Sequence, residues 1–188
     1  MEIFNNTTKV VKDDLVKKIQ SGSKVSVAAA CFSIYAYQAL KHELEHCDEF
    51  RFIFTSPTFI AEKTPKERRE FYIPRLNREK GLYGTEFEVR IRNELKQKAV
   101  AKECAEWIRK KATFRSNKTW EGMNNFLVVE NPEDTYTYMP VNSFTTVDLG
   151  CERGHNISNM VTRFENPASK EFLHLFNTIW EDKEKLPM

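Results

Sequence analysis

The sequence lacks the short motifs that mark most enzyme and metal-binding sites. It contains no P-loop, no GxGxxG or GxSxG string, no HxH or HExxH pair, and no CxxC pair among its four cysteines. It also has no Asp and Glu pair at the spacing that a two-metal nuclease needs. These absences exclude an ATP-driven motor, a dinucleotide-binding loop and a zinc knuckle within this segment. We therefore expect no metal ion and no cofactor.

Signals for export or membrane insertion are also missing. The first residues, MEIFNNTTKV, have neither a basic start followed by an apolar stretch nor a cleavage site. No apolar run approaches the roughly 20 residues that a membrane span needs. We therefore expect no membrane partner, a cytoplasmic location, and free thiols at Cys31, Cys47, Cys104 and Cys151.

The chain does have the material for one packed core. Its 188 residues are 40% hydrophobic and include 14 Phe, which is more than a disordered segment carries. No internal repeat and no low-complexity linker divides it. We expect a single domain over residues 1–188.

Hydrophobic spacing predicts an α/β fold. Residues 24–32 are typical of a buried parallel strand, residues 34–46 of a helix, and residues 49–56 of a second strand, which together make a βαβ unit. A long helix is predicted at 86–111, and strands at 112–116, 124–131, 135–142 and 157–164, with a hairpin loop at NPEDT. A first helix near 10–22 and a closing helix at 168–186 complete the prediction. The closing helix should bury Phe172, Leu175, Phe176, Ile179 and Trp180.

Charge is distributed unevenly along the chain. The net charge is +2, but the stretch Lys63–Lys118 holds 17 Lys and Arg against 8 Glu, so it carries +9 and the remainder −7. Such asymmetry favours a polyanion partner, although a long helix with interleaved Glu can also be a solvated face. The candidate nucleic-acid contacts are Arg90, Arg92, Arg109, Lys110, Lys111, Arg115, Lys118 and Trp120.

Several strings carry a family resemblance that covers almost the whole chain. KVSVAAACFSIYAYQALKHEL and EFRFIFTSPTFI resemble the start of the phospholipase D-like domain that precedes the motor in bacterial Swi/Snf-type (superfamily 2) DNA helicases. FYIPRLNREKGLYGTEFEVRIRNELKQKAVAKECAEWIRKK and FTTVDLGCERGHN resemble one subgroup of these proteins. The resemblance implies a phospholipase D-like half-barrel with a mixed, mostly parallel sheet flanked by helices. It also implies a larger polypeptide with an ATP-binding, ATP-hydrolysing helicase motor, of which this chain is the N-terminal fragment.

The catalytic motif of that superfamily is degenerate here. Active members carry HxKxxxxD followed by an Asn in a GSxN-like turn, and their His attacks phosphorus while Lys and Asn stabilise the phosphoryl oxygens. The resemblance sets Met123 at the His position, Asn125 at the Lys position, and Asn142 or Ser143 near the Asn position. A thioether and a neutral amide cannot do this chemistry, so no catalytic residue is assigned. His155, which follows a glycine, is the alternative nucleophile, but it has Ile157 where a Lys partner is needed.

Three functions remain open from the sequence. The first is a non-catalytic accessory domain, a pseudoenzyme that gives a helicase extra contact with DNA or a partner. The second is a homodimeric phosphodiesterase or nuclease, because one motif per chain is half a site. The third is a dimerisation or interaction module in which the strand that carries the degenerate motif forms the dimer interface. The sequence does not distinguish a role in defence against foreign DNA from one in genome maintenance.

The first prediction follows from the substituted motif. Because Met123 and Asn125 supply neither a nucleophile at phosphorus nor a cation for its oxygens, the purified chain should nick supercoiled plasmid DNA no faster than its Met123→Ala variant does. Gel electrophoresis of the plasmid measures this. Cleavage that disappears in the variant would establish an active enzyme instead.

Overall fold

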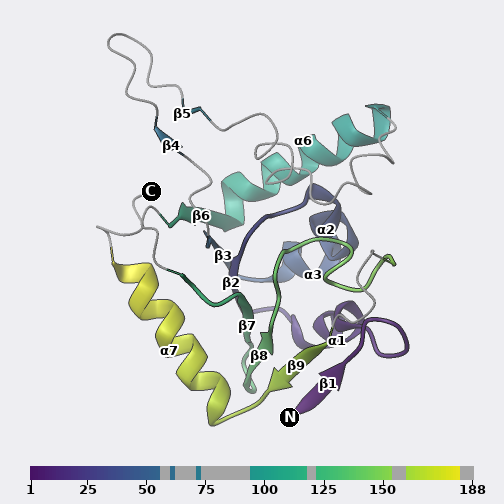
Figure 1. Cartoon of the computed structure of the whole chain (residues 1–188). Coiled ribbons are helices and arrows are strands. Elements are labelled where there is room, and N and C mark those ends of the chain that lie inside the picture. Colours follow the sequence, from purple (N-terminus) through teal and green to yellow (C-terminus); the bar gives the residue numbers. More distant parts are fainter. Residues whose placement is uncertain (56–59, 62–70, 73–93, 118–121, 154–159, 183–188) are drawn as a thin grey trace.

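The computed structural model describes residues 1–55, 60–61, 71–72, 94–117, 122–153 and 160–182 (Figure 1). The helices are α1 (Val11–Lys18), α2 (Ile34–Ala39), α3 (Lys41–His46), α6 (Glu94–Lys111) and α7 (Ala168–Glu181). The strands are β1 (Glu2–Phe4), β2 (Lys24–Ala29), β3 (Glu49–Phe54), β4 (Ile60–Ala61), β5 (Phe71–Tyr72), β6 (Ala112–Ser116), β7 (Phe126–Glu130), β8 (Thr135–Met139) and β9 (Val161–Phe164). The predicted α/β class is confirmed.

The main sheet has seven strands in the order β1-β9-β8-β7-β2-β3-β6, and β4 pairs with β5 separately. The predicted mostly parallel sheet is wrong. Only β2–β3 and β3–β6 are parallel, whereas β2–β7, β7–β8, β8–β9 and β1–β9 are antiparallel. The NPEDT loop accounts for part of this, because so short a connection can join only antiparallel strands. The side chain of Asn131 in that loop accepts from the backbone N–H groups of Glu133 and Asp134, at 3.0 and 2.8 Å.

The predicted βαβ unit is confirmed. β2 and β3 pair in parallel from Lys24↔Glu49 to Ala29↔Phe54, and the predicted helix between them is divided at Leu40 into α2 and α3. β2 also pairs with β7 on its other side, so it is an interior strand, and its residues from Val25 onward are buried. This explains its run of small and β-branched apolar residues.

Two layers of side chains cover the sheet. On one face Phe50, Phe52 and Phe54 of β3 join the larger core with α1, α2, α3 and α6. On the other face Ile53 and Phe126 pack with Phe176 and Trp180 of α7. Figure 1 shows α7 alone on its side of the sheet and the other helices opposite. Alternate residues of β3 therefore point to opposite faces of the sheet, with the three Phe side chains on one face and Ile53 on the other.

The closing helix follows the predicted pattern with one exception. Phe176 and Trp180 are buried and Phe172 and Ile179 pack against the smaller core, but Leu175 is 40% exposed, so its predicted burial is wrong. Leu175 directly precedes Phe176, and neighbouring positions on a helix point about 100° apart. Among the described helices, none is long and apolar enough to cross a membrane.

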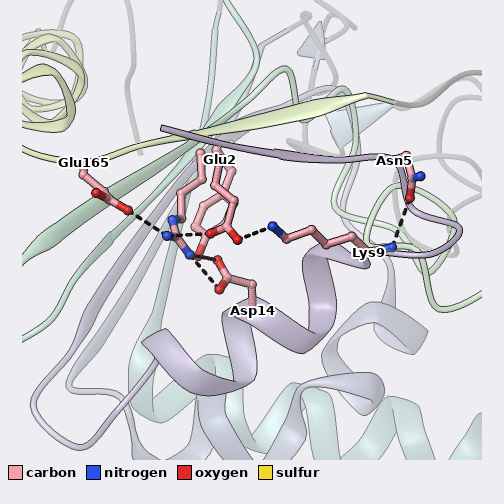
Figure 2. A network of polar contacts seen from close by, with 7 residues as sticks. Glu2, Asn5, Lys9, Asp14 and Glu165 are labelled. Atoms are coloured by element: carbon pink, nitrogen blue, oxygen red, sulfur yellow. Dashed lines mark hydrogen bonds and ion pairs between the residues drawn. The ribbon is translucent and has the colours of Figure 1, made fainter.

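Arg163 on β9 ties the start of the chain to the sheet (Figure 2). Its guanidinium pairs with Asp14 of α1, Glu2 of β1 and Glu165, at 2.7, 2.6 and 2.7 Å. Burial alone would lower the pKa of Arg163, but the hydrogen bonds that its guanidinium donates to Asp14 and Glu165 outweigh it and raise the pKa. The buried hydroxyl of Tyr138 also donates to Asp14, at 2.8 Å. One cation thus fixes β1 and α1 against β9.

The second prediction concerns this cation. Replacing Arg163 with Met leaves the carboxylates of Asp14 and Glu165 without their cation, and leaves Glu2 with Lys9 alone. We expect the free energy of unfolding to fall by about 3 kcal/mol, the lower end for a broken buried ion pair because Glu2 and Glu165 are partly exposed. Urea denaturation followed by circular dichroism measures it.

Lys9→Met is the matched control, since it breaks only the exposed pair of Lys9 with Glu2. This variant should lose less than about 1 kcal/mol. Equal losses in the two variants would show that Arg163 is no more than a surface ion pair.

Candidate functional site

The degenerate motif positions lie at the carboxyl end of the sheet, where the parallel strands β2, β3 and β6 finish. β7 runs against these strands, so it begins at this end, and β8 finishes here. The turn after β8 is fixed to the loop after β2 by three backbone hydrogen bonds. They run from the N–H groups of Ala30, Phe144 and Ser33 to the carbonyls of Asn142, Cys31 and Phe144, each at 2.9 Å. The fold therefore brings both halves of the motif to one place.

Asn125, at the motif's Lys position, has an unusual environment. Its side-chain Oδ1 is buried and has no hydrogen-bond partner. Its backbone carbonyl accepts from Val141 N–H at 3.2 Å, which sets Asn125 beside the turn that carries Asn142 and Ser143. A buried amide oxygen without a donor costs roughly 1–3 kcal/mol. Asn125 is thus a polar side chain whose buried oxygen the fold leaves without a donor.

Met123, which the resemblance sets at the His position of the motif, packs against the hydrophobic core. Its side chain packs against the cluster of Ala28, Ile53, Phe126, Val128, Phe176 and Trp180 on the α7 face. Asn142 is exposed and Ser143 is half-buried. This set can donate and accept hydrogen bonds, but it holds neither an imidazole nor a cation.

The histidines of the described residues lie elsewhere. His42 and His46 are on α3, whose C-terminal end precedes β3 and so lies at the amino end of the sheet, and His174 is on α7. His155, the alternative nucleophile, lies outside the described residues. Within the described part of the chain, no group of three or more His, Cys, Asp or Glu is placed to hold a metal ion.

The motif strand itself is enclosed. β7 pairs with β2 on one side and β8 on the other, and Phe126 to Val129 are all buried. No exposed apolar face of β7 exists to form a dimer seam. A homodimer through this strand remains a prediction only for the end of the strand, near Met123 and Asn125.

The basic residues form a separate surface on α6. Lys98, Lys102 and Arg109 are exposed, and none of them makes an ion pair with a described residue. At 3.6 residues per turn they lie within about 40° of one another on the helix, and roughly opposite the buried Trp107. We call these three residues the α6 basic stripe. Lys98 and Lys102 were not among the predicted contacts, although their i, i+4 spacing is a signal in the sequence.

The structure describes the side chains of four of the eight predicted nucleic-acid contacts, and these four do not form one surface. Arg109 and Lys110 are exposed at the end of α6. Lys111 is half-buried, and its Nζ donates to the Cys47 carbonyl at 2.7 Å. Arg115 is on β6, and its guanidinium contacts Trp180 of α7. The other four, which are Arg90, Arg92, Lys118 and Trp120, lie outside the residues whose side chains are described.

Arg115 belongs to the packing of α7. Its guanidinium carbon lies 4.3 Å from the centre of the Trp180 ring, and Nη1 donates to the Trp180 carbonyl. On the neighbouring strand, Arg51 lies 5.6 Å from the same ring and bonds Ser26 and Asn177. Burial lowers the pKa of Arg51. Both arginines therefore hold the last turn of α7 to the sheet and are not available to a ligand.

A surface pocket of about 350 Å³ lies between α3 and α6. It is lined by Lys41, Glu45, Glu103, Glu106, Trp107, Lys110 and Lys111. Lys41 pairs with Glu103 at 3.1 Å and with Glu45 at 3.8 Å. Because its three lysines are balanced by three glutamates, this pocket has no excess charge to attract a polyanion.

The third prediction compares two amides near the carboxyl end of the sheet. Asn125→Leu removes an unpartnered buried oxygen, so we expect the free energy of unfolding to stay level or rise by up to about 1 kcal/mol. Asn117→Leu is the matched control, because the buried Asn117 amide donates to the Thr55 carbonyl at 3.1 Å. That variant should lose about 1–3 kcal/mol. Thermal or urea unfolding measures both variants. Equal losses in the free energy of unfolding would mean that the Asn125 side chain has a hydrogen-bond partner in the folded chain.

Comparison with known proteins does not assign this site. The carboxyl end of the sheet offers amides and a hydroxyl, and the α6 basic stripe offers cations some distance from it. No protein-family model matches the chain, and no curated protein matches its sequence.

Proposed function

We propose that this chain is a non-catalytic phospholipase D-like domain, a half-barrel, that gives a helicase motor in the same polypeptide additional contact with DNA. The single observation that carries the DNA contact is the α6 basic stripe, Lys98, Lys102 and Arg109, exposed and without ion pairs among the described residues. The helicase and its cytoplasmic, bacterial setting rest on the sequence resemblance.

The stripe has dimensions that suit a nucleic-acid backbone. Lys98 and Arg109 are 11 positions apart, which is about 16 Å along a helix at 1.5 Å per residue. Phosphates follow one another at about 3.4 Å of axis along each strand of duplex DNA, so the stripe spans several of them. Arg109 also lies in the last turn of α6 with Lys110 and Lys111. The contact is one of phosphates and not of bases, because a stripe of cations alone does not read sequence.

Loss of catalysis follows from what replaced the motif. Phosphoryl transfer by a His nucleophile requires an imidazole and at least one cation at the phosphoryl oxygens. Met123 packs into the α7-side core instead, and Asn125 is neutral. Arg109, near the C-terminal end of α6, does not substitute for the Lys of the motif, because that end of the helix approaches the amino end of the sheet, where Lys111 bonds Cys47.

The fourth prediction tests the stripe. Replacing Lys98, Lys102 and Arg109 together with Gln removes three positive charges without adding repulsion, and Gln is a good helix former. We expect weaker binding to duplex DNA of any sequence. The slope of log K against log salt should become shallower by about 0.9 for each phosphate that the variant no longer neutralises. Fluorescence anisotropy with a labelled duplex over a series of salt concentrations measures both.

The matched control is the triple variant Lys17→Gln, Arg153→Gln and Lys170→Gln. It removes the same charge from exposed positions on other elements. If general charge attraction were responsible, both triple variants would weaken binding equally and the proposal would fail. Binding by the parent chain that does not depend on salt would contradict it as well.

A further inference from the structure

Two histidines on α3 are arranged as a chelating pair. His42 and His46 are four residues apart, so they lie on one face of the helix. Their ring centres are 4.5 Å apart, and the ring planes are inclined by 38°. The side chain of His42 is 82% exposed, and His46 is exposed too. A dissolved ion can therefore reach both rings.

The separation of the rings fits a shared metal ion. A metal–nitrogen bond to His is about 2.0–2.1 Å, and with bond angles between about 90° and 109° two imidazoles on one ion have ring centres roughly 4.5–5.2 Å apart. The observed 4.5 Å lies at the lower limit of that range. Small rotations of exposed side chains are enough to adjust it.

The Nδ1 atom of each ring faces an oxygen atom. His46 Nδ1 contacts the His42 carbonyl, one helical turn back. His42 Nδ1 lies 3.5 Å from a carboxylate oxygen of Glu43, whose side chain is only 13% exposed. Histidine ligands of metals commonly donate their second ring N–H to a carbonyl or a carboxylate, which fixes the tautomer and raises the basicity of the other nitrogen. Here this leaves the Nε2 atoms of both rings for an ion.

The geometry points to a binding site for a divalent late first-row transition metal, of the Cu²⁺, Ni²⁺ and Zn²⁺ class, chelated by His42 and His46. Imidazole nitrogen suits these ions, whereas Mg²⁺ and Ca²⁺ prefer oxygen. The described residues supply no third protein ligand, so water completes the coordination and one ion binds per chain. The sequence led us to expect no metal ion, and this proposal departs from that expectation.

Two of the four thiols do not compete strongly with this pair near neutral pH. Burial raises the pKa of Cys104 to about 12, and mainly burial raises that of Cys151 to about 11. Metals bind the thiolate, and these groups stay protonated. The nearby cation Lys41 is held by Glu45 and Glu103, which reduces its repulsion of an incoming ion.

The fifth prediction is tested by titrating the untagged chain with CuCl₂, NiCl₂ and ZnCl₂ in an isothermal calorimeter. We expect one ion per chain, with Cu²⁺ bound most tightly. His42→Ala and His46→Ala should each weaken binding about tenfold or more, and Glu43→Gln, which removes the partner of Nδ1, about tenfold. His174→Ala is the matched control on α7 and should change nothing. Electron paramagnetic resonance of the Cu²⁺ form should show two nitrogen ligands, one of which is lost in His42→Ala.

Each other outcome counts against the site. Equal affinities in His42→Ala, His46→Ala and His174→Ala would remove the histidine pair from consideration. If alkylating the thiols with iodoacetamide abolished binding, the metal ligands would be cysteines and not the two histidines. One ion per two chains, with a dimer in light scattering, would replace the water-completed site by a shared one. Circular dichroism of the variants confirms that these surface changes leave the fold intact.

Discussion

The aromatic side chain of Phe32 holds the carboxyl end of the sheet together. Phe32 lies three residues after the end of β2, is 3% exposed, and forms an isolated parallel bridge with Phe144. Its ring lies 5.2 Å from Phe114 of β6, 5.7 Å from Phe52 of β3 and 5.6 Å from Phe144. Aromatic pairs at such distances contribute roughly 0.5–1.5 kcal/mol each beyond the area they bury. The turn that carries Asn142 and Ser143 is therefore positioned by a core contact that does not depend on any bound ligand.

The two ends of the sheet differ in the side chains that they carry. The turn held by Phe32 and the start of β7 meet at the carboxyl end, where the motif positions are neutral. The C-terminal end of α6 lies at the amino end, because Lys111 bonds the Cys47 carbonyl just before β3 begins. The α3 histidines are near that end as well. The C-terminal end of α6 and the α3 histidines thus lie at the opposite end of the sheet from Met123 and Asn125.

The sequence predicted most elements, because local spacing decides them. The Phe alternation of β3 and the turn chemistry of Asn131 are read without knowing the fold. The β7–β8 hairpin was predicted from its loop, but the antiparallel pairs β2–β7, β8–β9 and β1–β9 were not, because they join segments far apart in the chain. Arg115 was misjudged for a similar reason, since only the arrival of α7 places Trp180 over it. The α6 basic stripe and the His42–His46 pair are different, because i, i+4 spacing would have revealed both.

The residues around the start of β7 are physically consistent with a stable fold. A nucleophilic imidazole beside a cation must be kept open and polar, and such strained sites usually cost stability. Met123 instead adds apolar contact to the cluster beneath α7, while β7 is enclosed by β2 and β8. Asn125 is the exception, because its buried Oδ1 has no hydrogen-bond partner. Packing therefore accounts for Met123 and β7, and Asn125 is the residue in this part of the fold that packing does not explain.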